Sequence, residues 1–174
     1  EVDKILTNAL KSVQGERGAG GFKNIYAVAM EPETGKILAM SGKGITDDGE
    51  VYDETVGVFA SAFEVGSIVK MASLLTGYTY GDLQYGQVYN DTPMQIKGTP
   101  EKKSWKNMGP IDENSAIGLS SNVYFYNVFI DLAEANYSPG EPLDINPKYF
   151  DVVRRSFEQF RLGSETWLNF DQTT

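Results

Sequence analysis

The residues best suited to covalent chemistry are Ser67 and Lys70, in the stretch 63–70 where a polar loop runs into an apolar segment. Residues three apart on a helix lie on the same face, so the serine hydroxyl and the lysine amine can come within hydrogen-bonding reach. A hydroxyl beside an amine base is the minimum geometry of an activated serine nucleophile. The N-terminal end of a helix also presents free backbone N–H groups, which suit the developing oxyanion of an acyl centre.

The same spacing has a structural interpretation, in which Ser67 caps a helix and Lys70 is exposed to solvent. The helix from Ser67 to about Tyr80 is predicted to be largely buried, because its apolar residues go most of the way round it. A partly desolvated lysine has a lowered pKa, which makes it a usable base near neutral pH. The spacing alone leaves both interpretations open.

Composition narrows the chemistry further. The sequence contains no histidine and no cysteine, which excludes within it a Ser-His-Asp triad, a cysteine nucleophile, a disulfide framework and a zinc site with nitrogen or sulfur ligands. Hydroxyl, amine, carboxylate and amide chemistry remains. We expect no cofactor.

The length and charge of the chain fit one folded domain that binds neither nucleic acid nor an anionic membrane. The 174 residues are 41% hydrophobic and 12% aromatic, with a formal net charge of −9, whereas those partners favour clustered Lys and Arg. The basic group of Lys102, Lys103 and Lys106 is too small to reverse this. No run of eighteen or more apolar residues and no signal-peptide pattern is present, so these residues are expected to be soluble, and an anchor upstream of Glu1 stays open.

The first part of the chain reads as a helix followed by a hairpin. Apolar residues at helical spacing predict an amphipathic helix over 2–13, ending at Gly15, with a flexible link at 18–21. Short apolar runs at 24–30 and 36–40, joined by turn residues, predict an antiparallel hairpin covered on both faces. The polar residues 42–58 predict a surface excursion.

The second part is predicted to be mostly helical. Short strands at 88–89 and 94–97 surround a turn at 90–93, and 100–108 is loop. A helix is expected from Pro110 to Leu119, followed by helices over 123–135 and 147–162 with a loop between them. The last of these carries an aromatic stripe that is predicted to be buried. An extended piece is expected at 166–170.

The break Ser120-Ser121-Asn122 separates two of these helices. Taken alone, it is a structural turn in which Ser or Asn caps the next helix. It follows Lys70 by fifty residues, however, and Ser-x-x-Lys followed by a Ser-x-Asn element is the order found in class A β-lactamases and penicillin-binding proteins. The break is therefore a candidate second wall for the same site.

Three stretches in this order, 29–40, 63–70 and 120–125, carry a resemblance to the transpeptidase domain of class B penicillin-binding proteins of Gram-positive type. The resemblance covers nearly the whole chain. It implies an α+β fold of the penicillin-binding-protein/serine β-lactamase-like kind. The chain would hold the N-terminal helix and hairpin of a central antiparallel sheet over 1–62 and the active-site helix with a mostly helical subdomain over 63–174, without the C-terminal strands of the sheet.

The resemblance also implies a penicillin-sensitive serine D,D-transpeptidase that cross-links peptidoglycan stem peptides. Ser67 would attack the carbonyl between two D-alanines, or a lactam carbonyl, and its backbone N–H would form half of the oxyanion hole. Lys70 would accept the proton of Ser67, and Ser120 would help pass it to the leaving amine. Asn122 and Ser121 are the implied substrate-binding residues, and Asn122 would also help to hold Lys70.

The implied partners are the stem peptide and β-lactam antibiotics, with cell-division or elongation proteins as further candidates. The implied location is the extracytoplasmic face of the bacterial membrane, with the anchor outside this chain.

Two features depart from the family pattern. Val65 stands where the family usually has proline, and the third motif, Lys-Thr-Gly or Lys-Ser-Gly, does not occur in the sequence. The isolated chain is therefore predicted to be inactive or weak, and a sheet lacking strands would expose an edge. A serine β-lactamase-like enzyme and a non-catalytic fragment that binds cell wall or partner proteins remain as alternatives.

Overall fold

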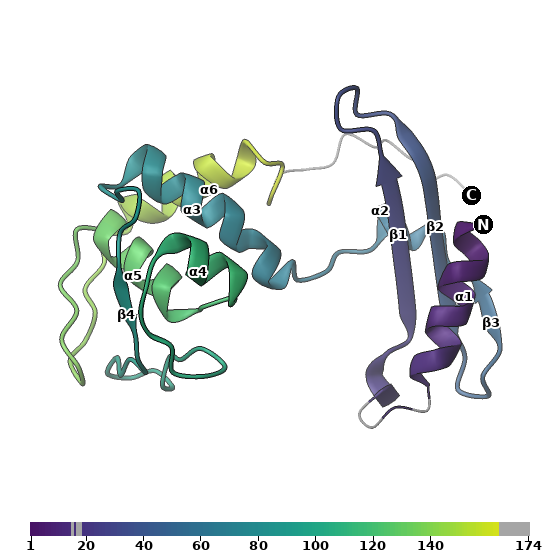
Figure 1. The fold of residues 1–174 in the computed structure, drawn as a ribbon, viewed down its shortest axis with the longest axis horizontal. Helices are drawn as coiled ribbons and strands as arrows, with labels where there is room; N and C mark the ends of the chain where they lie inside the picture. Colours follow the sequence, from purple (N-terminus) through teal and green to yellow (C-terminus); the bar gives the residue numbers. More distant parts are fainter. Residues whose placement is uncertain (15, 17–18, 164–174) are drawn as a thin grey trace. The chain divides into compact units, whose positions relative to one another are not determined.

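The computed structural model describes residues 1–14, 16 and 19–163, which belong to two compact units, Glu1–Glu64 and the residues from Val65 on. Figure 1 shows a sheet covered by a helix in the first unit and mostly helices in the second. The predicted α+β class is confirmed. Within the described residues, none of the helices has the length and apolar character needed to cross a membrane.

The first unit is a three-stranded antiparallel sheet with helices packed against it. Leu6 and Leu10 of the first helix are buried, as its amphipathic pattern predicted, and this helix packs along the second strand (Figure 1). The elements are α1 (Val2–Val13), a 3₁₀ turn (Ala19–Gly21), β1 (Asn24–Met30), β2 (Ile37–Ile45), β3 (Val51–Asp53) and α2 (Gly57–Ala60), with strand order β1-β2-β3.

The prediction of a surface excursion at 42–58 holds for residues 46–50, which form an exposed loop, and is wrong for the rest. Strand β2 continues to Ile45 with buried residues, and β3 and α2 follow. Gly42 and Gly44 interrupt the apolar pattern expected of a strand, and both positions need glycine because neighbouring groups pack closely against them. A Cβ on Gly42 would lie 2.4 Å from the carbonyl oxygen of Glu54, and one on Gly44 would lie 2.2 Å from the ring of Tyr52.

Two further predictions for the first unit are also corrected. The hairpin is not covered on both faces near its turn, since Val28 is 50% and Leu38 is 62% exposed. The described part of the expected flexible link, Ala19–Gly21, forms a 3₁₀ turn. Gly15, the predicted helix end, lies outside the described residues, and α1 ends at Val13.

In the second unit, α3 packs against three other helices. It contacts α4, α5 and α6, and the main apolar core consists of Leu83, Ile111, Ala116, Tyr124, Phe125 and Val128. A two-stranded antiparallel sheet completes the unit. The elements are a 3₁₀ turn (Gly66–Ile68), α3 (Val69–Tyr80), β4 (Tyr89–Asp91), β5 (Gly109–Ile111), α4 (Glu113–Gly118), α5 (Val123–Leu132) and α6 (Lys148–Glu158).

The helix predicted from Ser67 to Tyr80 exists but is not largely buried. Ile68 is 77% and Met71 is 64% exposed, whereas Lys70, Ser73 and Thr76 are buried. Helical periodicity marked the apolar residues as the buried ones, but the interior that faces this helix is partly polar. Tertiary context therefore overrode the pattern.

The strand and helix boundaries around residue 110 also differ from the prediction. The second strand is Gly109–Ile111 and not 94–97, and Asp91 ends β4 instead of lying in a turn. Pro110 lies in a strand that pairs on one side only, where a missing N–H is tolerated. The helix begins after Asp112, whose Oδ1 accepts from the N–H of Ser115 at 2.8 Å.

The break at 120–122 and the helices after it are confirmed, although α5 ends at Leu132 and α6 spans Lys148–Glu158. The aromatic stripe is only partly buried, since Phe150 is 51% and Phe160 is 43% exposed. The extended piece predicted at 166–170 lies outside the described residues.

Candidate active site

A serine and a lysine meet where the 3₁₀ turn passes into α3. The Nζ atom of Lys70 lies 3.2 Å from Oγ of Ser67, as the spacing predicted. Lys70 is 8% exposed, while Ser67 is exposed. Gly66 has a φ of 57°, a left-handed conformation that glycine adopts at little cost and that here directs the chain into the turn. An accessible hydroxyl thus rests on a buried amine.

The break between α4 and α5 brings three more oxygens to this amine. Nζ of Lys70 lies 2.7 Å from the carbonyl oxygen of Ser120, 3.0 Å from its Oγ and 2.8 Å from Oδ1 of Asn122. Oγ of Ser120 also donates to Oγ of Ser67 at 2.9 Å. Three predicted site residues, Ser67, Ser120 and Asn122, therefore contact the fourth, Lys70, and all four belong to the second unit.

The electrostatic setting of the amine favours its neutral form. Burial lowers the pKa of Lys70 from its ordinary value, and the negative charge of Asp91 opposes part of this shift. Asp91 is 1% exposed and does not contact the amine directly. A lysine whose pKa is lowered by desolvation is a better proton acceptor near neutral pH than an exposed one.

Ser120 occupies a strained position at the end of α4. The N–H of Ser120 bonds to the carbonyl of Ile117 at 3.1 Å and that of Ser121 to the carbonyl of Ala116 at 2.9 Å, which is the Schellman pattern. The left-handed residue of this motif is usually glycine, but Ser120 has a φ of 55°. A strained residue of this kind is retained where the surrounding structure holds it, often at functional sites.

Ser121 does not fit its predicted role in substrate binding. Its side chain is fully buried, donates to Asp91 and accepts from the N–H of Tyr124 at 2.9 Å. It therefore caps α5 from the interior and cannot touch a bound ligand in this conformation. For Ser121, the structural interpretation of the break was the correct one.

Two buried residues that the sequence did not predict, Ser104 and Asp91, form hydrogen bonds with the break. Oγ of Ser104 donates to Oδ2 of Asp91 at 2.6 Å and accepts from the N–H groups of Asn122 at 2.8 Å and Val123 at 3.2 Å. No local pattern pointed to either residue. Ser104 lies in a stretch predicted to be loop, and Asp91 is thirty residues from Ser121 in sequence.

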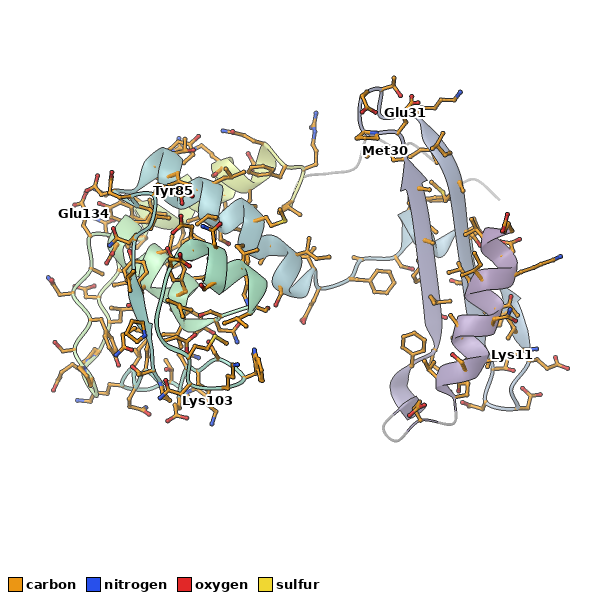
Figure 2. The ribbon with its side chains drawn as sticks, in the orientation of Figure 1. Lys11, Met30, Glu31, Tyr85, Lys103 and Glu134 are labelled. Atoms are coloured by element: carbon orange, nitrogen blue, oxygen red, sulfur yellow. The ribbon has the colours of Figure 1, made fainter. Side chains whose placement is uncertain are left out.

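Lys103 and Trp105, the neighbours of Ser104, also form hydrogen bonds at the break. The carbonyl of Lys103, labelled in Figure 2 on the loop between β4 and β5, accepts from Nδ2 of Asn122 at 3.2 Å. Nε1 of Trp105 donates to the carbonyl of Leu119 at 2.9 Å. Residues 103–105 are hereafter called the supporting segment.

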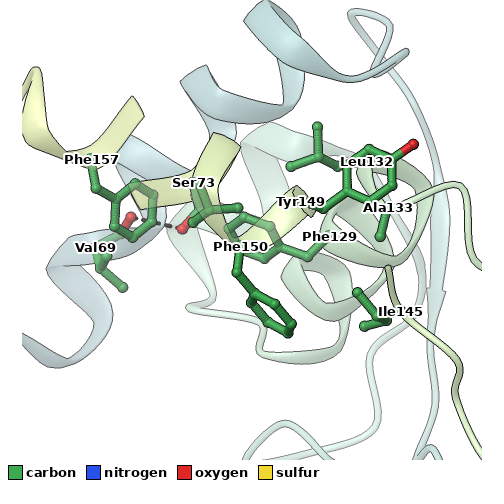
Figure 3. A pocket seen from close by; sticks show the side chains of 10 residues that line it. Val69, Ser73, Phe129, Leu132, Ala133, Ile145, Tyr149, Phe150 and Phe157 are labelled. Carbon is green, nitrogen blue, oxygen red and sulfur yellow. Dashed lines mark hydrogen bonds between the residues drawn. The ribbon is translucent and has the colours of Figure 1, made fainter. Parts of the chain in front are cut away.

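An apolar cavity of about 350 Å³ lies on another side of α3 (Figure 3). The one hydrogen bond drawn there joins Oγ of Ser73 to the carbonyl of Val69 at 2.9 Å. The lining offers no amine or carboxylate beside a hydroxyl, so the cavity lacks the groups for acyl transfer. It is lined by Val69, Ser73, Phe129, Leu132, Ala133, Ile145, Tyr149, Phe150, Val153 and Phe157.

The described residues also contain no group of three or more carboxylates placed to hold a metal ion. The Lys70 side of α3 is therefore the part of the described chain with groups arranged for chemistry.

A serine held on a buried lysine, with a Ser-x-Asn turn against both, is the arrangement expected of a penicillin-interacting acyl transferase. The chain belongs to the family of penicillin-binding protein transpeptidase domains, whose family model matches residues 25–173. This confirms the resemblance inferred from the three motifs.

Curated relatives and solved structures agree with this assignment. The chain is 33% identical to penicillin-binding protein 2A of Bacillus subtilis over 97% of its length and 35% identical to penicillin-binding protein H of the same species over 99%. It superposes on penicillin-binding protein 2B of Streptococcus pneumoniae strain 5204 with a TM-score of 0.87 and 30% identity over 95% of its length. It covers 24% of each Bacillus relative and 28% of the Streptococcus chain.

Proposed function

We propose that the protein containing this chain is a penicillin-sensitive serine D,D-transpeptidase that cross-links peptidoglycan stem peptides, with Ser67 as the nucleophile. The observation that carries the proposal is the position of Nζ of Lys70, which lies 3.2 Å from Oγ of Ser67 and is surrounded by oxygens of Ser120 and Asn122. Family membership supports the same reaction class.

Lys70 acts as the general base in this proposal. As a neutral amine it has two N–H groups and one lone pair. Two of its four oxygen neighbours, the carbonyl of Ser120 and Oδ1 of Asn122, can only accept hydrogen bonds. If the two N–H groups go to these acceptors, the lone pair is left for a hydroxyl proton. The geometry therefore allows Lys70 to act as a proton acceptor.

Acylation transfers the peptide carbonyl to Ser67 and releases the terminal D-alanine. Oγ of Ser67 forms a bond to the carbonyl carbon between the two D-alanines, and its proton passes to Lys70. The C–N bond to the terminal D-alanine breaks, and the leaving amine takes up the proton through Ser120, which touches both Ser67 and Lys70. The amine of a second stem peptide resolves the acyl-enzyme. In a β-lactam, the lactam C–N bond takes the place of the peptide bond.

Ser67 lies in the first turn of a helical segment, where backbone N–H groups have no intrahelical partner. We assign its N–H to half of the oxyanion hole. Asn122 is assigned to the amide of the ligand in addition to Lys70. Because Lys-Thr-Gly and Lys-Ser-Gly are absent from the sequence, the isolated chain is expected to acylate weakly. The proposed setting is the extracytoplasmic face of the membrane, with division or elongation proteins as partners.

Labelling with a fluorescent penicillin tests the proposal on the full-length protein. The unaltered protein should form a covalent adduct that survives denaturation, and Ser67→Ala should abolish it. Ser73→Ala is the control, because it removes a serine hydroxyl from α3, the helix that follows the 3₁₀ turn, and the described hydrogen bond of that hydroxyl goes to the carbonyl of Val69. Equal labelling of Ser67→Ala, or no labelling of the unaltered protein, would refute the assignment. Rapid release of the adduct would favour a β-lactamase.

A further inference from the structure

The side chain of Asn122 does not do what its position in the helix suggests. Asn122 is the N-cap residue of α5, where an asparagine side chain ordinarily accepts from the N–H groups of the first turn. Here it makes no such bond. Its Oδ1 accepts from Lys70 and its Nδ2 donates to the carbonyl of Lys103. Another group must therefore satisfy the first turn of α5.

Two serines supply the acceptors, and one of them, Ser104, comes from a distant loop. Its Oγ accepts from the N–H groups of Asn122 and Val123, and its proton goes to Asp91. The next N–H, that of Tyr124, is satisfied by Oγ of Ser121, which also donates to Asp91. The start of α5 is thus capped by two serines anchored on one buried carboxylate, and the asparagine is not required.

We propose that Ser104 is a positioning residue for acyl transfer, because its hydroxyl holds the backbone N–H groups of Asn122 and Val123 and so keeps the Asn122 side chain, which Ser121 frees from capping, on Lys70. The proposal rests on the proposed function for its kinetic consequence. Its structural content, the hold of Ser104 on the start of α5, stands independently of activity.

The rest of the supporting segment acts in the same direction. Lys103 fixes the amide of Asn122 in the orientation that points Oδ1 at Lys70. Trp105, although 69% exposed, ties its indole N–H to Leu119, next to the strained Ser120. Three consecutive residues therefore hold both ends of the break. None of the described hydrogen bonds joins the supporting segment to Lys70. The segment therefore affects the site indirectly, through the break.

Ser104→Ala in the full-length protein tests this role. Without the hydroxyl, the N–H groups of Asn122 and Val123 lack an acceptor, and the start of α5 is expected to shift and carry the Asn122 side chain away from Lys70. A crystal structure should show Oδ1 of Asn122 out of hydrogen-bonding range of Lys70. The acylation rate constant for a penicillin should fall by about tenfold to a hundredfold, the range expected when a reacting group is misplaced.

Two variants separate positioning from general damage. Ser104→Thr keeps the hydroxyl, and a cavity of about 170 Å³ lined in part by Ser104 leaves room for the added methyl, so acylation should be restored. Ser156→Ala is the matched control. It removes a similarly buried hydroxyl on α6, which lies 2.8 Å from the hydroxyl of Thr76 on α3. It should lower the melting temperature without slowing acylation.

A double mutant gives the sharpest outcome. If Ser104 acts through Asn122, Ser104→Ala should slow acylation no further in an Asn122→Ala background. The inference would be overturned if the two substitutions together slowed acylation by the product of their separate effects. It would also be overturned if Asn122 kept its position in the Ser104→Ala structure, or if folded Ser104→Ala acylated at the unaltered rate. Should Ser104→Ala not fold, Asp91→Asn replaces the charged acceptor of the Ser104 hydroxyl with a neutral amide and should displace Asn122 in the same direction. Failure of the unaltered protein to label would refute the proposed function, while the crystallographic test of Asn122 would still decide the inference.

Discussion

The two sides of α3 are buried by different kinds of contact, polar on one side and apolar on the other. Towards the break, Lys70 is buried and donates directed hydrogen bonds to Ser120 and Asn122. Towards α5 and α6, the helix faces an apolar cavity, where the contacts are of the kind seen between the rings of Phe129 and Phe157, whose centroids lie 6.4 Å apart. Hydrogen bonds fix direction as well as distance, whereas apolar contacts mainly remove surface from water.

The difference teaches where position and stability come from in this unit. The polar side carries a strained residue, Ser120, and a buried amine, both of which cost stability. The apolar side and the core around Tyr124 and Val128 supply the stabilisation that tolerates them. Changes on the polar side should therefore alter acylation most, and changes on the apolar side should alter unfolding most.

The largest expected effect is on the pH dependence of acylation. The reactive form of Lys70 is the neutral amine, so the rate should fall about tenfold for each pH unit below its apparent pKa, which burial places below the ordinary lysine value of about 10.4. The acylation rate constant, measured between about pH 6 and pH 10 under conditions where the protein stays folded, checks this. A rate constant that rises as the pH falls through that range would remove Lys70 as the base and with it the functional contrast between the two sides.

Truncation in the apolar core should give the complementary result. Val128 is 2% exposed and packs on α3 at Gly77. Val128→Ala should lower the free energy of unfolding by about 1 to 3 kcal/mol, because it removes buried methyl groups and leaves a cavity. Denaturant unfolding measures this loss. Acylation of the folded variant should match the unaltered protein, and a marked slowing would show that the two sides are not separable.

The smallest effect concerns the strain at Ser120. Both Ser120→Gly and Ser120→Ala remove the hydroxyl that touches Ser67 and Lys70, so both should acylate slowly. Only glycine relieves the positive φ, so the glycine variant should be more stable than the alanine variant by about 1 kcal/mol. Paired unfolding measurements test the difference. Equal stabilities would mean that the left-handed conformation carries no strain worth relieving.

The sequence predicted the parts of this molecule that depend on local patterns. The strand β1 was found with its observed bounds and the helix α1 with its observed start, because periodicity and turn residues are local. Ser67, Lys70, Ser120 and Asn122 were found through motif spacing, and the structure brings them into contact. Their catalytic roles stay predictions.

What the sequence could not reveal depends on contacts between distant residues. Asp91 supports Ser121 across thirty positions, and Ser104 caps a helix that begins nineteen residues later. Gly42 hid a strand because close packing, not side-chain pattern, determines it. Met71 was expected to be buried because periodicity does not show which face of a helix meets a polar interior. Each miss is a case in which tertiary contacts outweighed local preference.

The central claim is that Ser67 is the acylated residue, and peptide mapping by mass spectrometry after reaction of the full-length protein with a penicillin tests it most directly. The account predicts a single adduct, equal in mass to the intact antibiotic, on the peptide that contains Ser67, with the mass located on that residue by fragmentation. An adduct on Ser120 or on any other residue, or no adduct on a folded protein, would contradict it.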